Sequence, residues 1–171
     1  MKKPKEPQKI ILLNGPSSSG KSTLSHALQK QLKESLDINY SIVSIDDFLK
    51  LATKEKIHEN DVFQISCNMC EQVIKDIQKY DGVIIDHLIT SERIYEQLQK
   101  ALEQYTILTV LVTCPLDVLE EREKARKDRY VVSAEASYEC VYPRFGYDMS
   151  VDTFFVDPKM GALRIIYDAM M

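Results

Sequence analysis

A short segment near the start of the chain has the residue types and spacing of a phosphate-binding loop. The segment from Gly15 to Ser22, GPSSSGKS, matches G-x-x-x-x-G-K-[ST] at every defined position. Its glycines permit a tight turn whose N–H groups converge on a polyphosphate, its lysine adds a cation, and its last serine can ligate Mg²⁺. We therefore expect ATP and Mg²⁺ as cofactors, with Lys21 acting in catalysis and the nucleotide bound by Gly15, Ser17, Ser18, Ser19, Gly20, Lys21, Ser22 and Thr23.

Two aspartates that follow apolar runs supply carboxylates for the same chemistry. Asp86 ends the run Val83-Ile84-Ile85, which has the form of a Walker B element, so we expect Ser22 and Asp86 to hold Mg²⁺. The alternative for Asp86 is a cap of the following turn. Asp46 ends another apolar run and is expected to accept a proton from an acceptor hydroxyl. Asp47 is the alternative candidate for this role, because adjacent residues of a strand face opposite sides of the sheet and only one of the two can face the acceptor.

A highly charged segment over residues 115–129 offers guanidinium groups. Arg122, Arg126 and Arg129 are separated by four and three residues, so a helix would place all three on one face. Planar guanidinium groups make paired contacts with phosphate oxygens and stabilise charge during phosphoryl transfer. Beside a phosphate-binding loop, this pattern favours a lid over ATP. A solvated helix with ion pairs is the alternative.

These groups act together only if the chain brings several strand ends to one edge of a sheet. Apolar patterning predicts strands at 9–13, 40–45, 82–86, 106–113 and 151–156, and helices at 21–36, 62–79, 91–103, 115–129, 133–141 and 162–170. This alternation predicts an α/β protein of the P-loop NTPase fold, with a five-stranded, mostly parallel sheet flanked by helices and a small helical lid. Right-handed crossovers then place the loops after the strands on one edge.

Composition narrows the class of protein. The chain has 171 residues, of which 44% are hydrophobic and 28% charged, and its net charge is −4. We expect a single domain over residues 1–171, with the lid region at 115–145. The acidic balance disfavours nucleic-acid binding, and no apolar run is long enough to cross a membrane. We expect a cytoplasmic protein, and a homo-oligomer is left open.

Four cysteines and three histidines offer weaker signals. Cys67 and Cys70 form a C-x-x-C pair, but no second pair follows at metal spacing, so we interpret them as buried or idle thiols. His87 follows Asp86 directly, and it either lines the acceptor pocket or packs in the core. His26 lies on the helix that follows the phosphate-binding loop and is interpreted as structural.

Beyond single motifs, the chain resembles the chloramphenicol phosphotransferase-like proteins, a family of P-loop kinases. At the N-terminal side the resemblance covers residues 10–22 and then Asp46. Near the C-terminus it covers the run from Glu120 to Arg129, EEREKARKDR, followed by Tyr147-Asp148 and Val151-Asp152-Thr153. The second block is more specific than a P-loop, which many unrelated proteins carry.

The resemblance implies a reaction and a role for each matching residue. It implies an ATP-dependent phosphotransferase acting on a hydroxyl of a small molecule. Asp46 is then the base that activates the hydroxyl, and Arg126 and Arg129 are lid arginines that act in catalysis. The resemblance also implies that Lys21 and Ser22 contact phosphate and Mg²⁺, while the charged segment itself leads us to expect that Arg122 binds the nucleotide.

Other functions fit parts of the pattern. A catalytically weak nucleotide-binding module would keep the loop, and a kinase for another small metabolite or a nucleotide would keep the whole set. A GTPase is disfavoured, because the chain has no Asn-Lys-x-Asp sequence and no glycine at D-x-x-G spacing after Asp86. A kinase for polynucleotide ends is disfavoured by the acidic balance.

Overall fold

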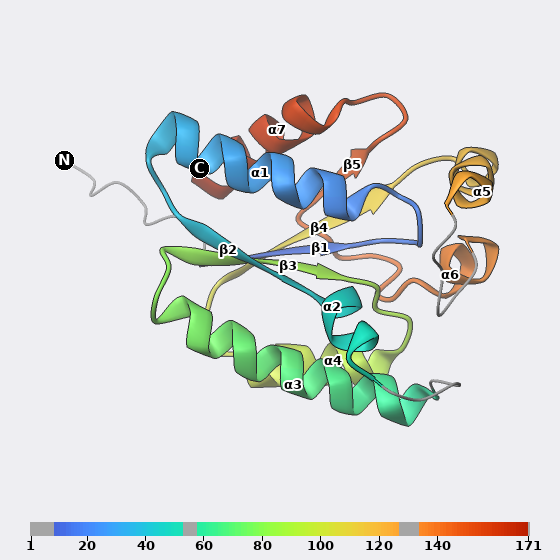
Figure 1. The fold of residues 1–171 in the computed structure, drawn as a ribbon, viewed down its shortest axis with the longest axis horizontal. Helices are drawn as coiled ribbons and strands as arrows, with labels where there is room; N and C mark the ends of the chain where they lie inside the picture. Colours follow the sequence, from blue (N-terminus) through green and yellow to red (C-terminus); the bar gives the residue numbers. More distant parts are fainter. Residues whose placement is uncertain (1–8, 53–57, 127–133, 171) are drawn as a thin grey trace.

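Five parallel strands form the centre of the computed structural model, which describes residues 9–52, 58–126 and 134–170 (Figure 1). The strands lie in the order β2–β3–β1–β4–β5. Their bounds are β1 Ile10–Asn14, β2 Tyr40–Ser44, β3 Gly82–His87, β4 Ile107–Thr113 and β5 Met149–Asp152. The predicted α/β class with a five-stranded sheet is confirmed, and every strand pair in the described residues is parallel.

Helices cover both faces of this sheet (Figure 1). One face carries α1 and α7, and the other carries α3 and α4, whereas α5 and α6 lie beyond the carboxyl ends of the strands. The bounds are α1 Lys21–Leu36, α2 Ile45–Lys50, α3 Glu59–Ile77, α4 Glu92–Ala101, α5 Leu116–Ala125, α6 Ala134–Cys140 and α7 Pro158–Met170. No helix within the described residues is long and apolar enough to cross a membrane.

The central strand β1 explains why both faces need a cover. All five of its residues are buried, and successive side chains point to opposite sides of the sheet. Ile11 and Leu13 join the core under α1 and α7, while Ile10 and Leu12 join the core under α3 and α4. A continuous apolar run is therefore the expected sequence for this position, as it is for β3.

Strand register places the functional segments beside one another. Leu13 of β1 is paired with Asp86 of β3, and Asp86 is paired in turn with Ser44 of β2. The phosphate-binding loop follows β1, and α2 follows β2 directly. The loop, the start of α2 and Asp86 thus meet at one edge of the sheet.

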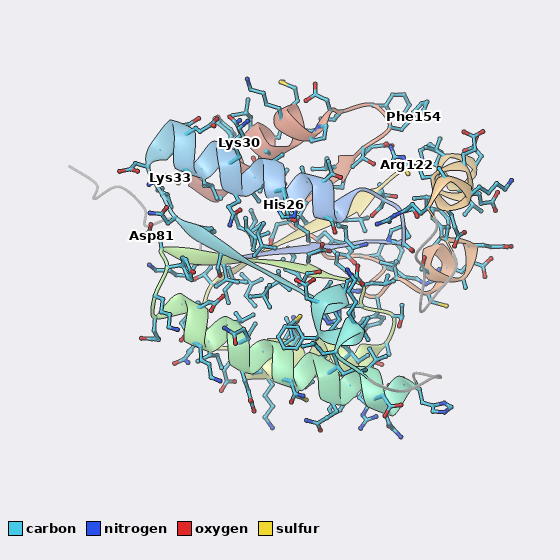
Figure 2. All side chains as sticks on the ribbon, viewed as in Figure 1. His26, Lys30, Lys33, Asp81, Arg122 and Phe154 are labelled. Carbon is cyan, nitrogen blue, oxygen red and sulfur yellow. The ribbon has the colours of Figure 1, made fainter. Side chains whose placement is uncertain are left out.

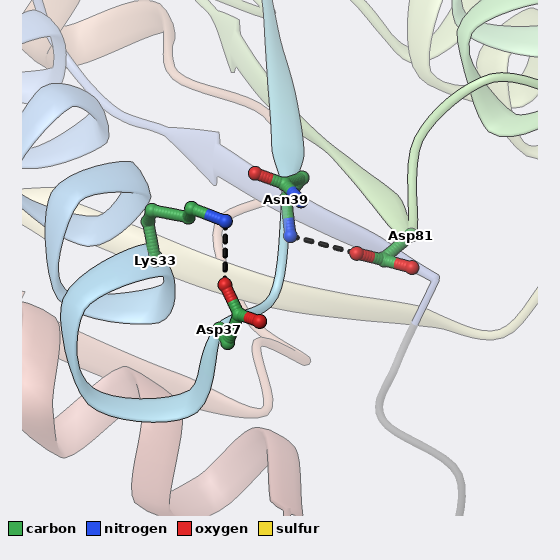
Figure 3. A network of polar contacts seen from close by, with 4 residues as sticks. All are labelled: Lys33, Asp37, Asn39 and Asp81. Carbon is green, nitrogen blue, oxygen red and sulfur yellow. Dashed lines mark hydrogen bonds and ion pairs between the residues drawn. The ribbon is translucent and has the colours of Figure 1, made fainter.

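Polar contacts fix the turns at the opposite end of the sheet, where α1 leads into β2 (Figure 3). Asp37 ends α1 in the left-handed conformation, and its carboxylate accepts a 2.5 Å hydrogen bond from Lys33. This contact lowers the pKa of Asp37. The N–H of Asn39 donates to Oδ2 of Asp81 at 2.7 Å, which joins the start of β2 to the turn before β3.

Several predicted boundaries were wrong. The strand expected at 40–45 ends at Ser44, and the short helix α2 was not anticipated. The helix expected to reach residue 129 ends at Ala125 within the described residues, because Arg126 has extended backbone angles. The fifth strand occupies residues 149–152 rather than 151–156, and the last helix begins at Pro158, whose fixed φ suits a first helical turn.

Candidate active site

The phosphate-binding loop runs from the end of β1 to the start of α1 and depends on its two glycines. A Cβ atom at Gly15 would lie 1.9 Å from the carbonyl oxygen of Val112, so no larger residue fits there. Gly20 has a φ of 92°, in the left-handed region that favours glycine. The motif therefore has the backbone geometry that its sequence predicts.

The start of α1 is suited to bind an anion. The helix begins at Lys21, and its N-cap residue, Gly20, has no side chain that could cap the first N–H groups. The amides of a first helical turn and the positive end of the helix dipole favour a phosphate at such a position. Nζ of Lys21 lies over the loop, where it donates to the carbonyl oxygens of Gly15 at 2.8 Å and Pro16 at 2.9 Å.

Ser22 and Asp86 form a pair of oxygen donors next to this loop. The hydroxyl of Ser22 donates to Oδ2 of Asp86 at 2.8 Å, and only 4% of Asp86 is exposed. The pKa of Asp86 is raised, mainly because the residue is buried and also because the carboxylates of Asp46 and Asp47 lie nearby. The charge of Lys21 and the hydrogen bond from Ser22 act in the opposite direction and lower this pKa.

These two residues fit a magnesium ion. Hydroxyl and carboxylate oxygens are the donors that Mg²⁺ prefers, and this ion usually keeps several waters and substrate phosphates as its other ligands. No group of three or more histidine, cysteine, aspartate or glutamate side chains suited to a metal occurs in the described part of the chain. The hydroxyl of Ser22 and the carboxylate of Asp86 therefore agree with Mg²⁺ carried by a nucleotide, whose phosphates and waters supply the other ligands.

Asp46 and Asp47 both lie in the first turn of α2, not on a strand as expected. Successive residues of a helix point about 100° apart, so the two carboxylates still diverge. Asp46 lines the cavity that the phosphate-binding loop borders, whereas Asp47 is not among the described lining residues. Helical geometry, and not the alternation of a strand, separates the two.

One cavity of about 520 Å³ joins these groups. Its walls come from the phosphate-binding loop, the starts of α1 and α2, the end of β3, the end of α5 and the segment from β5 to α7. The lining residues are Ser17, Ser18, Gly20, Lys21, Ser22, Thr23, Leu24, Ile45, Asp46, Asp86, Leu88, Arg122, Ala125, Arg126, Val151, Thr153, Val156, Asp157 and Pro158. This volume lies in the range of small-molecule sites.

Arg122 reaches from α5 back toward the sheet (Figure 2). One of its guanidinium nitrogens donates to the hydroxyl of Thr153 at 2.8 Å and to the carbonyl oxygen of Ser18 at 3.3 Å. The hydroxyl of Thr153 donates in turn to the carbonyl oxygen of Ser19 at 2.6 Å. Arg122 and Thr153 thus hold the phosphate-binding loop to α5 and to the end of β5.

The expected row of three arginines on one helical face is not observed. Arg126 lines the same cavity as Arg122, but its backbone is extended beyond the end of α5. A turn away from the helix, and not helical spacing, therefore brings Arg126 to the cavity. Arg129 falls outside the described residues.

Other contacts at the phosphate-binding loop were missed from the sequence. The hydroxyl of Ser137 in α6 accepts a 2.9 Å hydrogen bond from the N–H of Ser17. Asn14 donates to the carbonyl oxygen of Tyr142 and to the hydroxyl of Tyr147, both at 2.9 Å, and it accepts from the N–H of Ile89. Thr153 and Tyr147 were in the matched C-terminal block, but no motif pointed to Ser137.

His87 lies on the opposite face of the sheet from Asp86. Its ring is fully buried, and its Nε2 lies 3.1 Å from the hydroxyl of Ser66 in α3. Burial lowers the pKa of His87 to about 3, so the ring is neutral at physiological pH. Of the two expectations for His87, packing in the core is confirmed. Cys67 and Cys70 have raised thiol pKa values because of burial, which agrees with unreactive thiols.

Comparison with known proteins identifies the chain's relatives. A family model described as "Chloramphenicol phosphotransferase-like protein" matches residues 8–169. The resemblance predicted from the sequence is thereby confirmed. No curated protein matches the sequence.

Solved structures of similar fold include several kinases. The APS kinase of Mycobacterium tuberculosis, in complex with AMPPNP and APS, is 13% identical with a TM-score of 0.72, over 96% of this chain and 98% of that chain. A gluconokinase from Sinorhizobium meliloti 1021 is 17% identical with a TM-score of 0.64, over 96% of each chain. Kti12 of Chaetomium thermophilum, in complex with ADP-AlF3, is 16% identical with a TM-score of 0.65, over 95% of this chain and 99% of that chain. At such identities the likeness establishes a shared fold, that of the P-loop kinases.

Proposed function

Because the chain belongs to the chloramphenicol phosphotransferase-like family, we propose that it is an ATP-dependent kinase that transfers the γ-phosphate to a hydroxyl of a small molecule. The observation that supports this proposal most directly is the shared cavity. It is lined by the lysine of the loop, a paired serine and aspartate, a further aspartate and two arginines. Family membership and the kinase fold agree with this set of groups, and nucleotides occupy two of the structural relatives.

The phosphate-binding loop and the start of α1 hold the triphosphate in this mechanism. Backbone N–H groups of the loop bind its oxygens, and Lys21 exchanges its contacts with Gly15 and Pro16 for the β- and γ-phosphates. Ser22 and Asp86 would hold Mg²⁺, whose charge stabilises the transferring phosphate when the ion is bound. The pair is preorganised by its own hydrogen bond, which keeps both oxygens at the loop.

Asp46 serves as the base for the acceptor. Its carboxylate accepts the proton of the acceptor hydroxyl while the hydroxyl oxygen forms a bond to the γ-phosphorus and the bond to ADP breaks. Asp46 lines the cavity on the side of α2, whereas Arg122 and Arg126 line it on the side of α5. In this mechanism the reacting phosphate lies between the base and the guanidinium groups.

The segment at 115–145 closes the cavity as a lid in this mechanism. Its described parts, α5 and α6, contact the phosphate-binding loop through Arg122 and Ser137. Closure excludes water, which would otherwise compete with the acceptor for the phosphate. Arg126 approaches the phosphates from this segment, and Arg129 is assigned the same role from the family resemblance.

An acceptor screen tests the proposal. Purified protein is incubated with γ-labelled ATP, Mg²⁺ and a panel of small alcohols that includes sugars, amino alcohols and chloramphenicol. We expect labelled product with at least one alcohol class, and ATP consumption that depends on that acceptor. ATP binding without transfer to any alcohol would instead favour a nucleotide-binding module. Protein that neither binds ATP nor transfers phosphate would contradict the proposal.

A further inference from the structure

The last helix, α7, is apolar on two opposite faces. Its inner face, with Ala162, Ile165, Ile166 and Ala169, is buried in the core beneath α1. On its outer face, Met160, Leu163, Tyr167 and Met170 are exposed, and the exposed fraction reaches 65% at Tyr167. Their spacing of three, four and three residues makes one stripe along the helix. A regular apolar stripe on the surface marks an interaction site more often than scattered exposed residues do.

A groove accompanies this stripe at the free edge of the sheet. Strand β5 is paired with β4 on one side, and it is the last strand in the sheet order. Between β5 and α7 lies a groove of about 490 Å³, lined by Met149, Ser150, Leu163, Arg164, Tyr167 and Asp168. The surface therefore has a depression as well as an apolar ridge, and the two share Leu163 and Tyr167.

Charges flank the stripe in a self-complementary pattern. Arg164 and Asp168 lie one helical turn apart on the same side of the stripe, and both border the groove. A partner helix that runs antiparallel to α7 would pair with both charges if it placed an acidic residue beside Arg164 and a basic residue beside Asp168. A second copy of α7 presents this order, because a two-fold axis brings Arg164 of each copy toward Asp168 of the other.

The apolar stripe has the same symmetry. In an antiparallel pair, Met160 can face the second copy's Met170, and Leu163 can face the second copy's Tyr167. Both pairs have their midpoint at Ile165, so one register satisfies them together. The midpoint of Arg164 and Asp168 is residue 166, one residue beyond that centre. In the same register, Arg164 of one copy and Asp168 of the other are therefore offset by two residues, or about 3 Å along the helix axis. Their side chains are long enough to span it.

From this match we infer that the outer face of α7 joins two copies of the chain in an isologous, antiparallel contact. Each α7 lays its apolar stripe on that of the other copy, with a tyrosine against the groove and two reciprocal arginine–aspartate pairs at the flank. Tyrosine, methionine and arginine are residue types enriched in such interfaces. The inference does not depend on the proposed kinase activity, because none of these residues lines the candidate active site.

Sedimentation velocity of the full chain over a range of protein concentrations tests the inference. We expect a reversible dimer with twice the 19.7 kDa chain mass. Tyr167→Glu should weaken the dimer at least about tenfold, since a carboxylate would be buried against Leu163. Phe145→Glu is the matched control and should leave the dimer unchanged. It changes an exposed aromatic residue in the connection between α6 and β5, outside α7. Thermal unfolding checks that every variant is folded.

A charge swap distinguishes this contact from nonspecific association. Arg164→Asp and Asp168→Arg should each weaken the dimer, because like charges then face each other, and the double variant should restore it. A wild-type chain that stays monomeric at all concentrations would overturn the inference, as would a dimer that survives Tyr167→Glu or a double variant without recovery. Monomers that instead bind phosphatidylcholine–phosphatidylglycerol vesicles through Tyr167 would also overturn it and assign the face to a membrane.

Discussion

The hydroxyl of Ser22 donates a 2.8 Å hydrogen bond to Oδ2 of Asp86, across 64 residues of sequence. This contact joins the phosphate-binding loop to the end of β3. It also places the two oxygen atoms expected to hold Mg²⁺ beside the lysine expected to hold phosphate. Substitution of either residue therefore has defined consequences for nucleotide binding and for stability.

Removing either oxygen should weaken binding of MgATP more than binding of free ATP. We expect Ser22→Ala and Asp86→Asn to lower the affinity for MgATP by roughly 10- to 100-fold, since each removes a group that orients the metal. Calorimetric titrations with ATP in the presence of Mg²⁺ or EDTA measure the difference. Ser25→Ala is the matched control, because Ser25 lies on the same helix and donates to the carbonyl oxygen of Ser22 outside the cavity. Equal losses for MgATP and free ATP would exclude a metal role for the pair.

The same Asp86→Asn variant should be more stable than the wild type. Burial raises the pKa of Asp86, so its charged form costs folding stability at neutral pH. This cost shrinks as the pH falls below the raised pKa, and it is lost only below the ordinary value of 3.8, where the carboxyl of the unfolded chain is protonated as well. We therefore expect Asp86→Asn to raise Tm at pH 8 by about 2–4 °C for each kcal/mol relieved, with a smaller difference at acidic pH. A variant that is less stable than the wild type at pH 8 would show that the charge is compensated in the folded state.

His87 predicts a loss of stability on acidification. Its pKa is lowered from 6.5 to about 3 by burial, so the unfolded chain binds a proton between these values that the folded chain does not. This group therefore makes stability fall as pH falls from 6.5 toward 3, by up to about 1.4 kcal/mol per pH unit. In His87→Gln this contribution is absent, and the free energy of unfolding should depend less on pH over that window. Urea denaturation at a series of pH values measures it, and identical slopes for both proteins would refute the assignment.

The hydroxyl of Thr153 should matter for both stability and nucleotide binding. It accepts from Arg122 and donates to Ser19, so Thr153→Val leaves two polar groups without this partner at nearly constant volume. We expect a loss of about 1–3 kcal/mol in the free energy of unfolding, together with weaker ATP binding. Thr109→Val removes a comparable hydroxyl contact, between β4 and Asp148, and serves as the control. It should reduce stability without changing ATP affinity, and equal effects of both variants on ATP affinity would contradict the role of Thr153.

The sequence predicted the elements whose patterns are local and strong. The loop from Gly15 to Ser22 and the buried runs of β1 and β3 were found because such glycine spacing and such unbroken apolar runs are rare elsewhere in folded chains. The start of α2 was missed because Asp46 and Asp47 continue directly from an apolar strand, and no residue marks the change. Asp46 nonetheless lines the cavity, because it comes two residues after the end of β2, at the edge of the sheet where the phosphate-binding loop lies. Its location therefore depends little on whether its own backbone is extended or helical.

Contacts between segments that lie far apart in the sequence could not be predicted from it. The alternation of charged residues in α5 gave no sign that the helix ends before Arg126, so helical spacing wrongly placed Arg122 and Arg126 on one face. Ser137 belongs to a short helix of ordinary composition, and its contact with Ser17 depends on how α6 packs. Such partners are set by tertiary structure, which one sequence does not encode in any local pattern.

Two adjacent aspartates provide the sharpest test of whether Asp46 activates an acceptor hydroxyl beside the bound triphosphate. The measurement is the rate of phosphate transfer from γ-labelled ATP to the best acceptor of the screen, for the wild type, Asp46→Asn and Asp47→Asn, with ATP affinity measured in parallel. We predict that Asp46→Asn keeps its ATP affinity and loses transfer by at least about a hundredfold, while Asp47→Asn stays near the wild-type rate. A wild-type rate in Asp46→Asn, or an equal loss in both variants, would show that Asp46 is not the base.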